Sequence, residues 1–369
     1  MTSSTFFESL LSLSVQVAIV IVAASWTARR RKQEGEAHRV WAACHFFILL
    51  LVATALLIPH LRLYSTSLKT AMVEPSTTAT LASTFETDLL FLWFAGAAVG
   101  CLALLLGTLH AVQILRSSKP FHLNNPVGAP ASPATAIALQ MQNGKAVQLL
   151  TSPRTATAFC WQFHRPIIVL PDTMRTFTIE ELQGVVRHEM AHLTADHPLH
   201  LFLQRLVEIL FWFHPLVWWA SRQAAWSREF HCDASAVATA HEAVSYLRGL
   251  LRMTEQRVEF GLGLPAGLAF ASSVSMIQRR VNRIARRDWD VLPVCPSFAT
   301  IFAPLVLSAL MAYFIWLPVN ADASNRAVWS PWPRWSAVAL HELGIRARDF
   351  ELDGYRLRPQ EHLDKGRVL

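Results

Sequence analysis

Four stretches of the sequence are each apolar enough, and long enough, to cross a lipid bilayer as a helix. They cover residues 10–28, 40–59, 89–115 and 297–318. A membrane-spanning helix needs about 20 apolar residues. The composition agrees, because only 16% of the residues are charged, whereas soluble domains average about 25%. Buried helices of a soluble protein are the alternative, but the sequence favours an α-helical integral membrane protein with four transmembrane helices.

Basic residues flank these stretches unevenly and predict how the chain is oriented. Residues 29–39 hold five Lys and Arg side chains, and further basic clusters follow the third stretch and precede the fourth. Loops rich in Lys and Arg stay on the cytoplasmic side of a plasma membrane. Because the net charge of +7 resides largely in these clusters, direct nucleic-acid binding is not expected. The pattern predicts an external N-terminus, an external loop at 60–88, a cytoplasmic domain at 116–296 and an external tail at 319–369.

The expected cytoplasmic region has a mixed pattern that predicts an α+β domain. Residues 116–135 are rich in Pro, Ser and Asn and are typical of a linker. Residues 136–150 and 166–170 are typical of strands. After them, Thr178 and Glu181 have the spacing of a capping box, which predicts the start of a helix.

Residues 199–220 are nearly apolar enough to suggest a fifth span. Polar and charged side chains and Pro215 interrupt the stretch, and its longest uncharged run, 209–220, is too short to cross a bilayer. We predict a core helix that rests against the membrane.

The segment HEMAH at 188–192 lies on the helix predicted after the capping box. Residues four apart share one helical face, so His188 and His192 can aim their imidazoles at one metal ion. Histidine is a common zinc ligand, and Glu189 is placed to take a proton from a metal-bound water. A solvated polar helix face is the alternative, but the capping box and apolar spacing favour a single catalytic Zn²⁺.

A catalytic zinc usually takes three protein ligands and leaves a fourth position for water. Glu229 is the best third ligand, and Asp233, four residues later, can accept a hydrogen bond from a ligand imidazole. A solvated acidic face is the alternative for this pair. The other candidates are His197 and His200, which leave the helical register at Pro198, His231, and Cys232, which is expected to point off the Glu229/Asp233 face.

Together these segments resemble the BlaR/MecR-type integral-membrane metallopeptidases, which serve as signal transducers and antirepressors. The resemblance covers residues 1–318, including the layout of four spans with the peptidase between the third and fourth. The segments that carry it are RPIIVLP at 165–171, HEMAH, WFHPLVW at 212–218 and EFHCD at 229–233. The resemblance implies a gluzincin domain in which zinc is held by His188, His192 and Glu229, Glu189 is the general base, and Asp233 supports a ligand from behind.

The sequence departs from the family at two places. The family has an acidic residue five positions after the second histidine, whereas here Asp196 comes at four and His197 takes the fifth; the role of Asp196 stays open. The β-lactam sensors carry a penicillin-binding domain after the fourth span. Residues 319–369 contain no Ser-x-x-Lys motif, so β-lactam sensing by that route is not expected.

The leading functional hypothesis is a regulated membrane endopeptidase that cleaves a cytoplasmic regulator, such as a transcriptional repressor, or its own chain. The expected partners are this protein substrate and the lipid bilayer, and a homodimer is compatible with the hypothesis. Arg228, His231 and His214 are unranked candidates for stabilising the oxyanion. The substrate is expected to lie extended, by strand addition, along Ile167, Ile168, Val169 and Leu170.

Two alternatives stay open. One is a constitutive quality-control peptidase of the HtpX type, which shares the HExxH and Glu-x-x-x-Asp pattern. The other is a non-catalytic receptor whose zinc site is structural.

Overall fold

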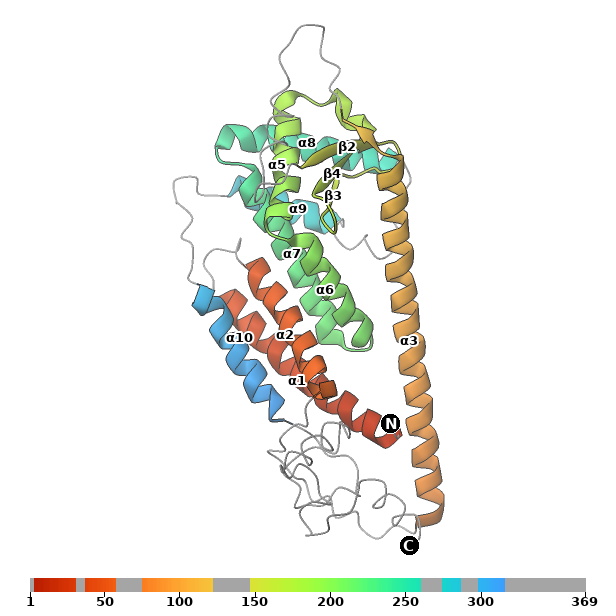
Figure 1. Cartoon of the computed structure of the whole chain (residues 1–369). Coiled ribbons are helices and arrows are strands. Elements are labelled where there is room, and N and C mark those ends of the chain that lie inside the picture. The colour runs from red at the N-terminus through yellow and green to blue at the C-terminus, as the bar shows by residue number, and fades with distance from the viewer. Residues whose placement is uncertain are drawn as a thin grey trace.

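The computed structural model of the chain describes residues 3–30, 37–57, 75–121, 147–259, 274–286 and 298–315. In this part of the chain, a bundle of long helices lies below a small domain of helices and strands (Figure 1). The helices are α1 (Ser3–Arg29), α2 (Ala37–Leu57), α3 (Pro75–Ser117), α5 (Ile179–Thr194), α6 (His197–Leu210), α7 (Pro215–Ala236), α8 (Ala240–Glu259), α9 (Val274–Ala285) and α10 (Phe298–Tyr313), with a 3-10 turn, η2, at Asp172–Thr176. The strands are β1 (Lys119–Pro120), β2 (Gln148–Ser152), β3 (Phe159–Trp161) and β4 (Ile167–Pro171).

Three of these helices are long and apolar enough to cross a membrane. Their apolar parts are Ser9–Arg29 in α1, Ala37–Leu56 in α2 and Thr87–Ser117 in α3. α10 packs against α1 and α2 (Figure 1). Its apolar part, Phe302–Tyr313, is shorter than the roughly 20 residues that a span needs. The end of the expected fourth span, 316–318, lies outside the described residues.

α3 begins earlier than the sequence pattern indicated. The expected external loop at 60–88 is helical from Pro75 onward, and residues 58–74 lie outside the described part of the chain. Proline suits the first turn of a helix because its missing N–H would have no helical partner there. The helix therefore starts about four turns before the apolar stretch that begins at Leu89.

Residues 199–220, expected as one core helix, instead form most of α6 and the start of α7. Pro215 explains the break, because proline has no N–H and disfavours the helical conformation in the residue before it. His214 is accordingly extended, with φ −93° and ψ 112°. The chain turns back at this point, and α7 returns toward α5 (Figure 1).

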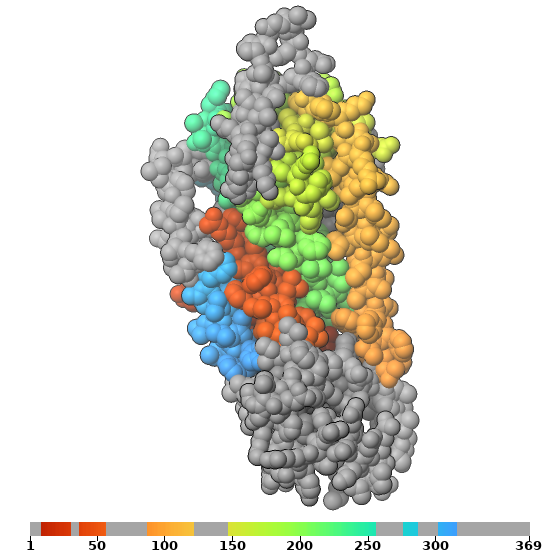
Figure 2. Space-filling model, in the orientation of Figure 1, coloured from red at the N-terminus to blue at the C-terminus, as the bar shows by residue number. Residues whose placement is uncertain are grey.

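The hairpin formed by α6 and α7 packs among the membrane helices. It lies between α2 and α3 (Figure 1), and α6 contacts both of them. Val217, Ala220 and Ala224 of α7 belong to one apolar core with buried residues of α1, α2 and α10. In Figure 2 the green surface of the hairpin fills the space between the red helices and the orange α3. The α6–α7 hairpin therefore shares one apolar core with the membrane helices.

Three indoles fix the turn of this hairpin. Trp218 Nε1 donates a hydrogen bond to the carbonyl oxygen of Trp212 at 2.7 Å. Trp93 Nε1, from α3, donates to the carbonyl oxygen of Leu210 at 3.0 Å, and Trp212 Nε1 donates back to that of Trp93 at 3.3 Å. These bonds connect α3 to the tip of the hairpin.

Replacing Gly96 with alanine should loosen this connection. A Cβ atom on Gly96 would overlap the Trp212 indole, and overpacking a fitted contact costs about 1–3 kcal/mol. Gly107→Ala in the same helix is the matched control, because a Cβ atom there meets nothing within 4 Å. Thermal unfolding in detergent should show a lower midpoint for G96A only. Equal midpoints would show that α3 does not depend on this contact.

The sheet has the strand order β1-β2-β4-β3, with β2 and β4 parallel and the other pairs antiparallel. β4 is buried along its whole length. Ile168 and Leu170 of this strand share a core with Leu182 and Val186 of α5, which fixes α5 against the sheet. Of the strand expected at 136–150, only the end is described, as part of β2.

Candidate metal centre

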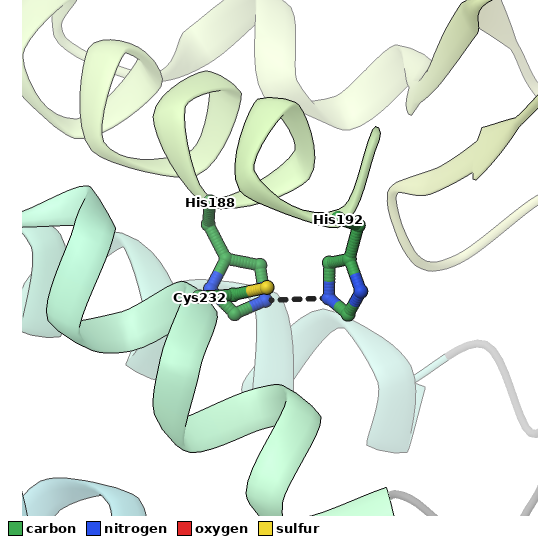
Figure 3. A group of neighbouring side chains, drawn as sticks. All are labelled: His188, His192 and Cys232. Atoms are coloured by element: carbon green, nitrogen blue, oxygen red, sulfur yellow. Dashed lines mark hydrogen bonds between the residues drawn. The ribbon is translucent and has the colours of Figure 1, made fainter. Parts of the chain in front are cut away.

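α5 presents the two histidines of the HEMAH segment on one face. The expected capping box fixes its start: Thr178 Oγ1 accepts from the Glu181 N–H, and the Glu181 carboxylate accepts from the Thr178 N–H. One face of the helix then carries His188 and His192, whose Nε2 atoms are 3.3 Å apart. Figure 3 shows both rings pointing from α5 toward α7.

α7 brings Glu229 to the same point. Its Oε2 lies 3.6 Å from His188 Nε2, and its Oε1 lies 3.7 Å from His192 Nε2. Ligand atoms held 2.0–2.1 Å from a tetrahedral zinc lie about 3.3–3.4 Å from one another. The spacing and the chemistry of these three side chains therefore fit a single zinc ion.

Cys232 also faces this point, which corrects the expectation that it points away. One ligand atom from each of His188, His192 and Cys232 lies within 4.8 Å of the others (Figure 3). Residues three apart on a helix are neighbours, just as residues four apart are. Cys232 and Asp233 can therefore both approach the centre from the turn that follows Glu229.

Glu229 and Cys232 differ in charge before a metal binds. Burial acts to raise the pKa of Glu229, but the positive charge of Arg280 and the hydrogen bond with His188 outweigh it and hold that pKa well below its usual range. Burial and the nearby Glu229 carboxylate raise the pKa of Cys232 well above its usual value. Without a metal, Glu229 is therefore an anion while Cys232 is a neutral thiol.

Glu189 has the properties of a general base. Burial raises its pKa to about 7, against the opposing effect of His188, and a base is most useful when its pKa lies near the working pH. Cys160 lies on β3, and burial together with the charge of Glu189 raises its pKa. β3 therefore borders the same site.

Asp233 and Tyr246 contact His188 at Nδ1, the ring nitrogen that does not face the other ligand atoms. Asp233 Oδ1 lies 3.2 Å from His188 Nδ1, where the sequence predicts a hydrogen-bond acceptor for a ligand imidazole. The Tyr246 hydroxyl lies 2.9 Å from the same nitrogen and donates to Asp233 Oδ1 at 2.7 Å. These contacts direct His188 Nε2 toward the other ligand atoms. Nothing in the local sequence distinguishes Tyr246 from an ordinary core tyrosine.

His197 and His200, the alternative ligands, lie beyond His192. His197 Nδ1 is 3.0 Å from His192 Nδ1, so it supports the ring on the side opposite Nε2. The His200 ring centre lies 6.1 Å beyond that of His197. Asp196, whose role was open, has a left-handed backbone (φ 52°) between α5 and α6 and accepts a hydrogen bond from Gln162 at 2.5 Å. It shapes the junction of the two helices.

The three oxyanion candidates lie at different places. His214 is at the start of α7, fifteen residues before Glu229 and hence about 22 Å away along the helix, so it is excluded. Arg228 donates a hydrogen bond to α6 at 2.9 Å. The His231 ring lies 4.0 Å from the ring of His38 in α2. Arg228 and His231 thus share a helical turn with Glu229, and their role stays a proposal.

The expected docking strand is not open to a substrate. Ile167, Ile168, Val169 and Leu170 form β4, which is paired with β2 on one side and with β3 on the other. An added strand would need a free edge. Within the described sheet, the free edge beside α5 belongs to β3.

Comparison with known proteins identifies the family of the chain. A family model described as BlaR1 peptidase M56 matches residues 4–284, from α1 to α9. The chain is also similar to the Regulatory protein BlaR1 of Bacillus licheniformis, with 29% identity over 170 residues, which make up 45% of this chain and 28% of that relative. The match thus spans little more than a quarter of the relative's length. Since the family model covers most of the sequence, the chain belongs to the BlaR1-type M56 peptidase family.

Proposed function

We propose that the protein is a membrane-embedded zinc endopeptidase in which His188, His192 and Glu229 hold one zinc ion and Glu189 is the general base. The observation that carries the proposal is the set of distances, 3.3, 3.6 and 3.7 Å, among the ligand atoms of these three side chains. Membership of a peptidase family and three helices able to cross a membrane support it.

The residues of the site account for amide hydrolysis. A zinc ion bound here would polarise the scissile carbonyl and make a bound water more acidic. Glu189 takes a proton from the attacking water, whose oxygen bonds to the carbonyl carbon. The protonated Glu189 gives that proton to the leaving nitrogen as the C–N bond breaks. Asp233 and Tyr246 keep His188 oriented throughout.

β3 is the proposed docking edge for the substrate. It is the outer strand beside α5, and its three residues are partly exposed. Burial and the charge of Glu189 raise the pKa of Cys160 in this strand. An extended peptide can add to such an edge through backbone hydrogen bonds. The substrate is therefore an extended segment of protein, and a cytoplasmic regulator or the chain itself is its proposed source.

The basic clusters support a plasma-membrane orientation with the metal centre in the cytoplasm. In this orientation a cue from outside would reach the site through the membrane helices that share a core with α7. A signal-transducing antirepressor fits this arrangement.

Removing the metal should abolish cleavage reversibly. The full chain, purified in detergent, is expected to contain one zinc ion by elemental analysis. A zinc chelator should stop cleavage of a peptide library, and added zinc, but not magnesium, should restore it, because histidine nitrogens suit zinc and not magnesium. Full cleavage by metal-free protein would contradict the proposal.

Cys232 supports a second candidate function, a receptor with a structural zinc site. Structural zinc sites are closed by four protein ligands, whereas catalytic sites keep one position open for water. His188, His192 and Glu229 would become such a closed set if the Cys232 thiolate joined them. Replacing Cys232 separates the two functions.

A further inference from the structure

We propose that Arg280, in α9, is a positioning residue of this centre: its guanidinium fixes the orientation of Glu229 and of the Asp233–Tyr246–His188 contacts. The inference rests on the proposed function and extends it. It adds a residue that lies far along the chain from the recognised motifs.

The Arg280 guanidinium contacts three groups around the centre at once. Its Nε donates to Asp233 Oδ2 at 2.9 Å, and its Nη2 donates to Asp233 Oδ1 at 2.6 Å and to the Tyr246 hydroxyl at 2.9 Å. Its Nη1 lies 3.0 Å from Glu229 Oε2. Arg280 is only 8% exposed. The planar fork of arginine is suited to such a set of partners, which the single ammonium of lysine cannot reproduce.

These contacts decide which nitrogen of His188 carries a proton. Arginine can only donate, so the Tyr246 oxygen accepts from Arg280 and its one proton goes to Asp233. In the contact between Tyr246 and His188 Nδ1, the histidine must then be the donor. With its proton on Nδ1, neutral His188 keeps the lone pair of Nε2 for a metal. The Asp233 carboxylate, 3.2 Å from the same nitrogen, can only accept and favours the same tautomer, and Arg280 holds both Asp233 and Tyr246 in the position where they accept.

Arg280 also provides the positive charge that two buried carboxylates need. Glu229 and Asp233 are four residues apart on the same face of α7, and Asp233 is 2% exposed. Buried charges of one sign repel each other unless they are paired. A guanidinium that touches both offsets this repulsion and fixes where the two carboxylates lie.

α9 has other contacts that hold it in place. The guanidinium of Arg279 stacks on Trp226, and that of Arg283 stacks on Phe230, each at 4.4 Å from the ring centre. Met276 of the same helix is fully buried. Arg280 can therefore be changed with α9 still docked, so its effect on the centre can be measured separately.

The test compares Arg280→Met and Arg280→Lys with Arg286→Ala in the full chain in detergent. Zinc affinity is measured by competition with a chelator, and kcat and KM on a peptide substrate. Partners that orient a ligand typically change metal affinity by about 10–100-fold. We expect R280M to lose zinc affinity by this factor and to lower kcat more than KM. R280K should be intermediate. R286A should match the wild type, because Arg286 is an exposed arginine directly after α9.

A double-variant comparison separates positioning from general stability. If Arg280 acts partly through its hydrogen bond to the Tyr246 hydroxyl, R280M should cost less zinc affinity in a Tyr246→Phe background than in the wild type. The proposal would be overturned if R280K and R280M both keep the zinc affinity and kcat of the wild type. If R280M does not fold, the zinc affinity and kcat of R280K alone test the proposal. A wild-type protein that neither binds zinc nor cleaves would instead refute the proposed function itself.

Discussion

Replacing Glu189 with glutamine should lower kcat/KM by about 10²–10⁴-fold while the protein keeps its zinc, because general-base catalysis contributes a factor of this size. Glutamine has the shape of the buried carboxylate but cannot take a proton from water. His188, His192 and Glu229 are unchanged in this variant. Cleavage and metal content should be measured on the same preparation, and a proteome-wide comparison of cleavage products with the wild type would identify the substrate.

Glu180→Gln is the matched control for this experiment. Glu180 is exposed in the first turn of the same helix, so its loss of charge should leave cleavage unchanged. Wild-type cleavage by E189Q would show that Glu189 is not the base. Loss of zinc from E189Q would mean that Glu189 helps to hold the metal, which the proposed ligand set does not allow.

Glu229→Ala should release zinc, whereas Cys232→Ser should retain it. The alanine variant keeps only His188 and His192, and removing a ligand should cost more than the roughly 10–100-fold that follows the loss of a supporting residue. The Cys232 thiol is neutral before a metal binds, so serine should leave the three-ligand set intact. Chelator competition on both variants gives the comparison directly.

Cys101→Ser controls for the loss of a thiol, because Cys101 is exposed on α3. If C232S loses zinc as E229A does, four protein ligands close the site and the receptor hypothesis replaces the peptidase. If E229A keeps zinc with wild-type affinity, Cys232 or another residue is the third ligand.

The parts of the site that follow local helical geometry could be predicted from the sequence. The capping box at Thr178 sets the start of α5, and the spacing of four places His188 and His192 on one face. The same spacing brings Glu229 and Asp233 to the centre from α7. Each of these predictions depends only on residues within a few turns of one another.

What the sequence could not show depends on contacts between distant segments. In the sequence, Arg280 is one of several basic residues in a cluster. Only the packing of α9 against α7 shows that it contacts Glu229 and Asp233. Tyr246 has no local pattern that separates a hydrogen-bonded tyrosine from a packed one. The Ile167–Leu170 run is equally apolar at a sheet edge or at its centre, and only the pairing with β2 and β3 shows that it is central. Pro215 is visible in the sequence, but only the packing of α6 and α7 shows that the chain reverses its direction there.

The core shared by α7 and the membrane helices makes the metal centre part of one thermodynamic cycle with the bilayer. Ala224 is packed against those helices, and Glu229 follows five residues later on the same rigid helix. If a lipid environment shifts the preferred tilt of α2, we expect the free energy of metal binding at α7 to change with it. Linkage makes this relation reciprocal. We therefore expect metal binding to raise the melting temperature of the bundle, and bilayer thickness to change metal affinity.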